Sequence, residues 1–304
     1  MPDTALPRRE VRWERMFPDE LEAAFAACPV VYFAYGLAEP HGPQNALGLD
    51  ILKAHAICQR AAWEHGGVVA PGDFWHIHEC SGSASWAMHE IGEVERPWLT
   101  AVPPWHHFKS VLYHIRTADT LGFKAAILFT GHYGPNWNDL NTMVDLIRPH
   151  VGTRLYSLPD FEANTVGHTG SFADHAGRVE TSQLWALEPE LVDISRIPEE
   201  GTPGPHFAMG VDAHLADRKI GEEMVASQVE FLGKKAAELV AEYDRVKPEH
   251  KLKTFEDVEV LWRDVVKPHL NEFWTMKDGW NDLHEVRHDS RWYANWRIPA
   301  IAKE

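Results

Sequence analysis

The chain has little of what marks secreted and membrane proteins. It contains only three cysteines in 304 residues, Cys28, Cys58 and Cys80, and they form no Cys-x-x-Cys pair. We therefore expect reduced thiols in a cytoplasmic protein and no disulfide framework. No apolar stretch approaches the roughly 18–20 residues of a membrane span. The first residues also lack the apolar core of a signal peptide.

Positive charge is scarce as well. Lys and Arg number 29 against 45 Asp and Glu, which gives a formal net charge of −16, and no Lys/Arg-rich run occurs. A net negative charge of this size repels phosphate backbones, so nucleic acid is not an expected partner. The 44% of hydrophobic residues excludes wholesale disorder, and the length suits one large α/β domain.

Two residue types are abundant instead, with 19 His and 13 Trp. Histidine is the commonest metal ligand, and tryptophan builds apolar pockets and interfaces. The composition therefore favours metal sites and a small-molecule pocket.

Strands and helices alternate along the first 240 residues or so. Apolar, β-rich runs predict strands at 30–36, 68–72, 124–130 and 154–158. Apolar residues at helical spacing predict helices at 18–28, 50–65, 106–122, 138–147, 181–187 and 216–243. This alternation predicts a doubly wound α/β fold, with a mostly parallel sheet covered by helices on both faces.

The remainder of the chain, residues 245–304, has a different character. It shows no sheet pattern, and tryptophans stand among many charges, at positions 262, 274, 280, 292 and 296. We expect a main domain over residues 1–244. The Trp-rich extension over 245–304 would pack on that domain or on a neighbouring subunit.

The strongest local signal is Glu39-Pro40-His41, followed nine residues after the histidine by Asp50. These side chains follow a predicted buried strand, and sites in open α/β sheets form beyond the carboxyl ends of strands. Carboxylate and imidazole groups suit Zn²⁺ or Mn²⁺. A surface Glu and a helix-capping Asp would explain this segment alone without any metal.

Two further polar segments also lead into predicted helices. Residues 130–136 read TGHYGPN at the end of a strand, and residues 174–182 read DHAGRVETS. Glycines in such loops let the backbone turn sharply and approach a ligand closely. Three polar segments in equivalent positions favour one functional site over unrelated surface residues.

Together these segments resemble the creatininase (creatinine amidohydrolase) family. GLAEPHGPQNALGLD, FKAAILFTGHYGPN and DHAGRVETSQLWALEPELVDISRI resemble its three motifs in order and in approximate separation, over about residues 18–240. The resemblance implies a creatininase-like three-layer αβα fold. It also implies a metal-dependent hydrolase with two divalent ions per chain, Zn²⁺ and/or Mn²⁺.

The resemblance assigns the ligands by matched position. Glu39 and His132 would hold one ion, His41 would hold the other, and Asp50 would bridge the two. Some family members carry a further Glu two residues after the matched histidine.

That position is a glycine here, Gly134. We therefore predict that Glu180 completes the second site. Thr130 and Tyr133 also depart from the family pattern, which leaves the substrate open.

The implied chemistry is attack by a metal-bound hydroxide on the carbonyl of a small cyclic amide, lactam or formamide. His175 is the predicted proton donor to the leaving amine, because a histidine titrates near neutrality. Asp174 would orient His175 or touch the substrate. A loop histidine bonded to backbone is the structural alternative for His175.

The predicted substrate-binding residues are Tyr133, Asn136, His78 and Trp75. His78 belongs to a strand-like His-x-His pair near the site, and Trp75 would form either a pocket wall or core packing. His106 and His107 begin a predicted helix, where we expect them to be solvated.

Other functions remain open at this point. The same metal centre could open the ring of a keto-polyol by C–C hydrolysis. Alternatively, the chain could be a non-catalytic metal-binding assembly subunit that uses its Trp-rich extension as an interaction surface. By analogy with the family we expect a homo-oligomer, commonly a hexamer.

Overall fold

The computed structural model describes residues 9–78, 98–133, 136–166 and 174–276. Its centre is a parallel four-stranded sheet in the order β2-β1-β3-β4. The strands are β1 (Val30–Tyr35), β2 (Val68–Val69), β3 (Ala125–Thr130) and β4 (Arg154–Pro159). Every residue of β1 and β3 is buried, as expected for central parallel strands with continuous apolar runs. The predicted α/β class with a parallel sheet is confirmed.

The predicted helices are present, with ends shifted by a few residues. The helices are α1 (Pro18–Ala27), α2 (Leu49–His65), α4 (Pro104–Leu121), α5 (Asn136–Ile147), α6 (Asp160–Ala163), α7 (Arg178–Leu187), α8 (Arg218–Val246) and α9 (Phe255–Leu261). Local chemistry fixes several ends. Asp217 accepts a hydrogen bond from the Ile220 N–H and caps the start of α8. Gly122, at φ 83°, ends α4 in the left-handed conformation.

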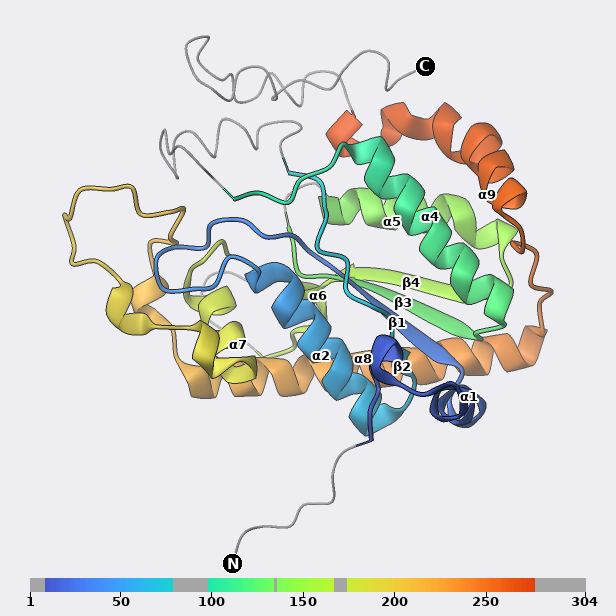
Figure 1. Ribbon diagram of the computed structural model, residues 1–304, viewed down its shortest axis with the longest axis horizontal. Helices are drawn as coiled ribbons and strands as arrows, with labels where there is room; N and C mark the ends of the chain where they lie inside the picture. Colours follow the sequence, from blue (N-terminus) through green and yellow to red (C-terminus); the bar gives the residue numbers. More distant parts are fainter. Residues whose placement is uncertain (1–8, 79–97, 134–135, 167–173, 277–304) are drawn as a thin grey trace, which may run out of the picture.

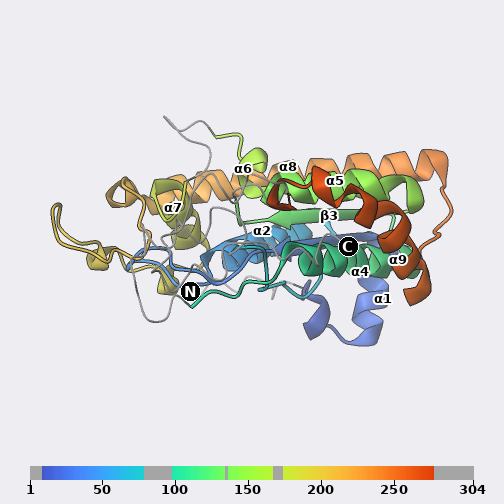
Figure 2. The same ribbon diagram turned by 90° about the horizontal axis from the view of Figure 1, so that it is seen from above.

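Alternate strand residues face two separate hydrophobic cores, which makes the fold a three-layer αβα arrangement. Phe33 and Leu128 face the core formed with α1, α4 and α5. Tyr32 and Ile127 face the core formed with α2 and α8. Figure 1 shows α4 and α5 on one side of the sheet and α8 on the other. In Figure 2, α8 runs along the length of the molecule.

The strand order places a topological switch between β1 and β3. The chain leaves β1 through α2 to reach β2 on one side, and returns through α4 to β3 on the other side. Tyr35 pairs with Thr130 and Thr130 with Pro159, so the three strands end level with one another. The loops that follow β1 and β3 therefore lie side by side, where ligands bind in such sheets.

The first part of the Trp-rich extension packs into the α4–α5 side of the molecule. Six of its residues are buried in that core, Leu252, Val258, Val266, Leu270, Phe273 and Met276. Asp139 of α5 accepts hydrogen bonds from the N–H groups of Trp274 and Thr275. Trp280, Trp292 and Trp296 lie outside the described residues.

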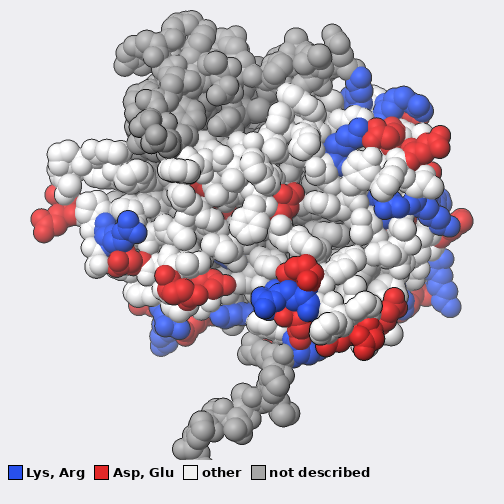
Figure 3. All heavy atoms as spheres, in the orientation of Figure 1, with Lys and Arg blue, Asp and Glu red and all other residues white. Residues whose placement is uncertain are grey.

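Two surface properties bear on partners. On the face shown in Figure 3, Lys and Arg side chains stand among Asp and Glu side chains and form no continuous basic patch. None of the described helices is long and apolar enough to cross a membrane.

Candidate metal centre

Two glycines at the strand ends make room for the start of α2. A Cβ atom on Gly36, directly after β1, would lie 2.8 Å from the Cβ of Asp50. A Cβ atom on Gly131, directly after β3, would collide with the Asp50 carbonyl oxygen. Because both neighbours lack a side chain, Asp50 reaches the switch point between the two strands.

Asp50 is the centre of a buried cluster of acids and histidines. Its Oδ1 lies 3.1 Å from Nε2 of His41, and its Oδ2 lies 2.9 Å from Nδ1 of His132. Glu39 Oε1 lies 3.0 Å from the same His132 nitrogen. Glu39, His41 and Asp50 are almost wholly buried, whereas the His132 side chain is 13% exposed. The cluster therefore opens towards solvent on the His132 side.

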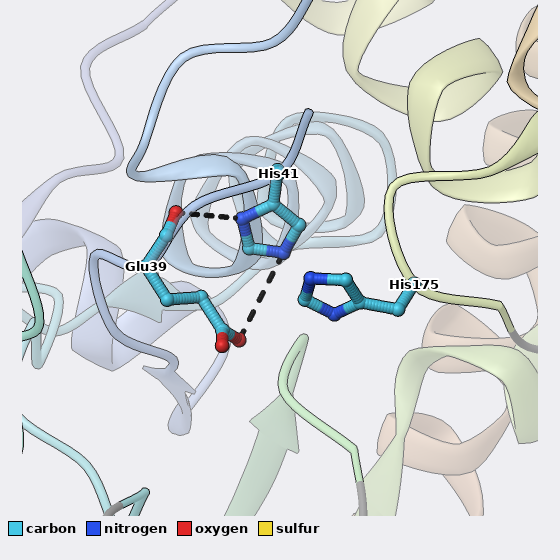
Figure 4. Close-up of side chains that lie close together, drawn as sticks. All are labelled: Glu39, His41 and His175. Atoms are coloured by element: carbon cyan, nitrogen blue, oxygen red, sulfur yellow. Dashed lines mark hydrogen bonds and ion pairs between the residues drawn. The ribbon is translucent and has the colours of Figure 1, made fainter. Parts of the chain in front are cut away.

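His41 is oriented in the manner of a metal-binding histidine. Its Nδ1–H donates to the backbone carbonyl of Glu39 at 3.0 Å, and Nε2 faces the Glu39 carboxylate (Figure 4). Such a bond fixes the ring and directs the other nitrogen to a metal. His175 stacks on this ring, with centroids 4.5 Å apart.

Glu180 reaches the same cluster from the first turn of α7. Its Oε2 lies 3.7 Å from His41 Nε2 and accepts a hydrogen bond from the Ala176 N–H at 2.8 Å. Its Oε1 accepts from the ammonium group of Lys53 at 2.7 Å. The carboxylate is thus held at both oxygens.

Donor atoms converge in three groups that could hold a metal ion. The groups are Glu39–Asp50–His132, His41–Asp50–Glu180 and Glu39–His41–His175. The first two share Asp50, and together they contain the five residues that the sequence suggested as ligands. The third group includes His175, for which we predicted a different role.

Mutual charges dominate the electrostatics of the cluster. Burial opposes the imidazolium form, but Asp50 and Glu39 raise the pKa of His41 to about 9. Burial likewise opposes the charge on His132, and Glu39 and Asp50 raise its pKa to about 10. Burial would raise the pKa of Glu39, but the charges of His78 and His132 hold it well below its usual value.

The two predicted catalytic residues make backbone hydrogen bonds. His175 Nε2 donates to the Pro40 carbonyl at 3.0 Å, while burial and the nearby His41 lower the pKa of His175. Asp174 accepts hydrogen bonds from the N–H groups of Val179 and Glu180, so it caps the first turn of α7. Asp174 therefore fixes the helix that carries Glu180.

The predicted substrate-binding residues are spread over a wider region. His78 Nε2 lies 2.7 Å from Glu39 Oε2, which places His78 against the cluster. The hydroxyl of Tyr133 donates to Asp160 at 2.5 Å. Asn136 begins α5, and its side chain lies outside the described part of the structure.

Trp75 is 55% exposed and lines a neighbouring cavity of about 560 Å³ together with His107. His107 is only 2% exposed, so the expectation that it is solvated is wrong. The residue begins α4 on its inner face, and its ring packs against the rings of Tyr35 and His76. The His76 ring in turn lies 5.2 Å from that of His132, which belongs to the cluster.

Lys53 and Asp160 are the functional candidates that sequence reasoning missed. Lys53 is fully buried and pairs with Glu180 and Asp160. Asp160 directly follows β4, at the same edge of the sheet as the loops that carry Glu39 and His132. That position was a signal that could have been used. Lys53 lies one helical turn after Asp50 on α2, within a run of apolar residues.

Comparisons with known proteins agree with this architecture. A family model described as creatininase, creatinine amidohydrolase, matches residues 14–236, more than half of the chain. A creatinine amidohydrolase of Pseudomonas putida is 26% identical over 225 residues, which cover 67% of this chain and 80% of that protein.

Solved structures show the same fold. A manganese creatininase has 24% identity and a TM-score of 0.61, covering 76% of this chain and 98% of its own. A mutant creatininase of the Zn–Zn type has 23% identity and a TM-score of 0.60 at the same coverage. A putative creatinine amidohydrolase from Bacteroides fragilis has 20% identity and a TM-score of 0.61, covering 76% and 96%. Creatininase structures thus carry Mn or Zn, and this chain presents groups that could hold such ions. The chain belongs to the creatininase family and is a hydrolase with candidate metal-binding residues.

Proposed function

We propose that this protein is a dinuclear metal-dependent hydrolase that cleaves the C–N bond of a small cyclic amide, lactam or formamide. The proposal rests on the position of the Asp50 carboxylate, because its two oxygens face two different donor groups. The names of the relatives, creatinine amidohydrolases, support an amide bond as the target.

The donor set fits two divalent cations. Nε2 of His41 is buried within 4 Å of three carboxylates, and the nearest oxygen is Asp50 Oδ1 at 3.1 Å. Carboxylate oxygens and imidazole nitrogens in this mixture suit Zn²⁺ or Mn²⁺. Glu39 and His132 would hold one ion, His41 and Glu180 the other, and Asp50 both. When bound, such ions bring the pKa of water towards neutrality and polarise a carbonyl.

The protein's own residues would bind the substrate and move its protons. The substrate would enter on the His132 side, where the cluster is exposed. His175 lies against His41, and its hydrogen bond to Pro40 fixes its ring beside the donor groups. We propose that His175 takes up a proton from the attacking water and gives it to the leaving nitrogen. Tyr133 and His78 lie close enough to the cluster to contact a small substrate, and we propose this role for both.

A screen with metal analysis tests the proposal. Protein reconstituted with Zn²⁺ or Mn²⁺ is assayed on cyclic amides, formamides and keto-polyols, beside Asp50→Ala. The exposed Asp145→Ala provides a matched loss of a carboxylate away from the site. We expect C–N hydrolysis by wild type and Asp145→Ala and none by Asp50→Ala. Opening of keto-polyols alone would replace the proposed bond with a C–C bond, and two bound ions without any hydrolysis would contradict the proposal.

A further inference from the structure

Lys53 is a fully buried ammonium group whose partners come from separate parts of the fold. Its Nζ lies 2.7 Å from Glu180 Oε1, 3.2 Å from Asp160 Oδ2 and 2.7 Å from the Tyr133 hydroxyl. It also lies over the Tyr133 ring, 4.3 Å from the centroid. Buried charge networks of this kind, taken as a whole, are often no more stable than well-packed apolar residues in their place. Stability alone therefore gives no reason for a lysine here.

The contact with Glu180 gives such a reason. Lys53 holds Oε1, whereas Oε2 faces His41 Nε2 at 3.7 Å and belongs to a group of donors that could hold an ion. The two oxygens of one carboxylate thus have separate tasks. We propose that Lys53 is a positioning residue of the metal centre, which fixes Glu180 so that Oε2 alone serves the second ion. This inference rests on the proposed function.

Lys53 is itself held by two partners besides Glu180. Asp160 follows β4, Tyr133 follows β3, and both contact the ammonium group. α7, which carries Glu180, packs mainly on α2 and α8. Lys53 therefore connects the Glu180 carboxylate to the ends of β3 and β4. A hydrogen-bonding partner of this kind orients a metal ligand, and losing one typically weakens metal affinity about 10–100-fold.

The charge of Lys53 alone would not favour metal binding. Glu39, Asp50, Glu180 and Asp160 are all buried, and Lys53 offsets part of their negative charge. A positive charge beside the site repels divalent cations. The expected contribution of Lys53 to metal affinity therefore comes from the orientation of Glu180.

The test compares Lys53→Met with Lys109→Met, a control that removes an exposed lysine paired with Glu259. The two metal affinities are measured by competition with a chromophoric chelator, and folding is checked by circular dichroism. We expect the second ion to bind about 10–100-fold more weakly in Lys53→Met, with the first ion changed much less. The control should match wild type.

A double-mutant cycle separates positioning from a general structural effect. If Lys53 acts through Glu180, adding Lys53→Met to Glu180→Gln should weaken the second ion no further. Equal losses in both backgrounds would overturn the inference, as would wild-type affinities in Lys53→Met. A wild-type protein that binds fewer than two ions would instead refute the proposed function, and this inference with it.

A structure of the metal-loaded wild type provides a test that does not depend on the variant's folding. Glu180 Oε1 should remain on Lys53, with Oε2 at an ion. A Glu180 that binds through both oxygens, or that has left Lys53, would contradict the positioning role.

Discussion

The raised pKa values of His41 and His132 predict opposite pH dependences for the metal-free and metal-loaded protein. Asp50 and Glu39 stabilise both imidazolium ions, with pKa values of about 9 and about 10. At neutral pH each histidine of the metal-free protein is therefore an imidazolium ion, with a second proton on its ring. A cation must displace that proton in order to bind.

In the metal-free protein, the protonated histidines stabilise the fold. Their folded pKa values exceed the ordinary value of 6.5, so this stabilisation is fully present below pH 6.5 and is lost as the pH rises through about 9 and 10. At about 1.4 kcal/mol per pKa unit, His41 alone corresponds to on the order of 3 kcal/mol. Metal binding has the opposite trend. The apparent affinity of each ion should rise about tenfold per pH unit while its histidine is protonated.

Two assays check these trends. Urea unfolding of chelator-treated protein between pH 6.5 and 10 should show a falling free energy of unfolding. Calorimetric metal titrations at pH 7 in buffers of different ionisation enthalpy should show about one proton released per ion. Rising stability of the metal-free protein over this range would refute the reasoning, and so would metal binding without proton release.

Four further outcomes are expected. Asp50→Ala should lose both ions in elemental analysis, because Asp50 belongs to both donor groups; full metal content would contradict the shared role. His175→Ala should keep both ions while kcat falls by roughly 10²–10⁴; metal loss would make His175 a ligand. Asp139→Ala should destabilise the protein by about 3 kcal/mol and speed proteolysis within 252–276, because two N–H groups and the Thr275 hydroxyl lose their acceptor; unchanged proteolysis would exclude this anchor. Light scattering should show a homo-oligomer, a hexamer by family analogy; a 34.5 kDa monomer at micromolar concentration would refute that expectation.

Much of the fold could be predicted because its central strands are buried on both faces. Continuous apolar runs then indicate β1 and β3 directly, and helical spacing indicates the helices between them. The start of α7 was placed too late, since its first turn is fixed by Asp174, which lies before the helix and caps it. Helix ends of this kind depend on contacts that periodicity does not record.

For a related reason, the sequence left open whether the extension that includes residues 252–276 packs on the main domain or on a neighbouring subunit. Two acids far away in the sequence fix this segment. Asp119 accepts hydrogen bonds from the N–H groups of Lys251 and Leu252, and Asp139 accepts those of Trp274 and Thr275. Each acid lies on a helix more than a hundred residues earlier, where nothing in its own neighbourhood indicates the partner.

Sequence motifs identify some residues of the candidate site, and the topology of the fold is needed to identify the others. The motifs suggested five ligands, and the structure brings them together because β1 and β3 end level at the switch point. Asp160 follows β4 at the same edge, so the rule that pointed to Glu39 also applied to Asp160. Lys53 is different, because the partners that explain it follow β3, follow β4 and begin α7. On α2 alone it is one lysine within an apolar run. A lysine on the inner side of a helix, one turn after a suspected ligand, therefore raises the question of which acid it holds, and here that acid is Glu180.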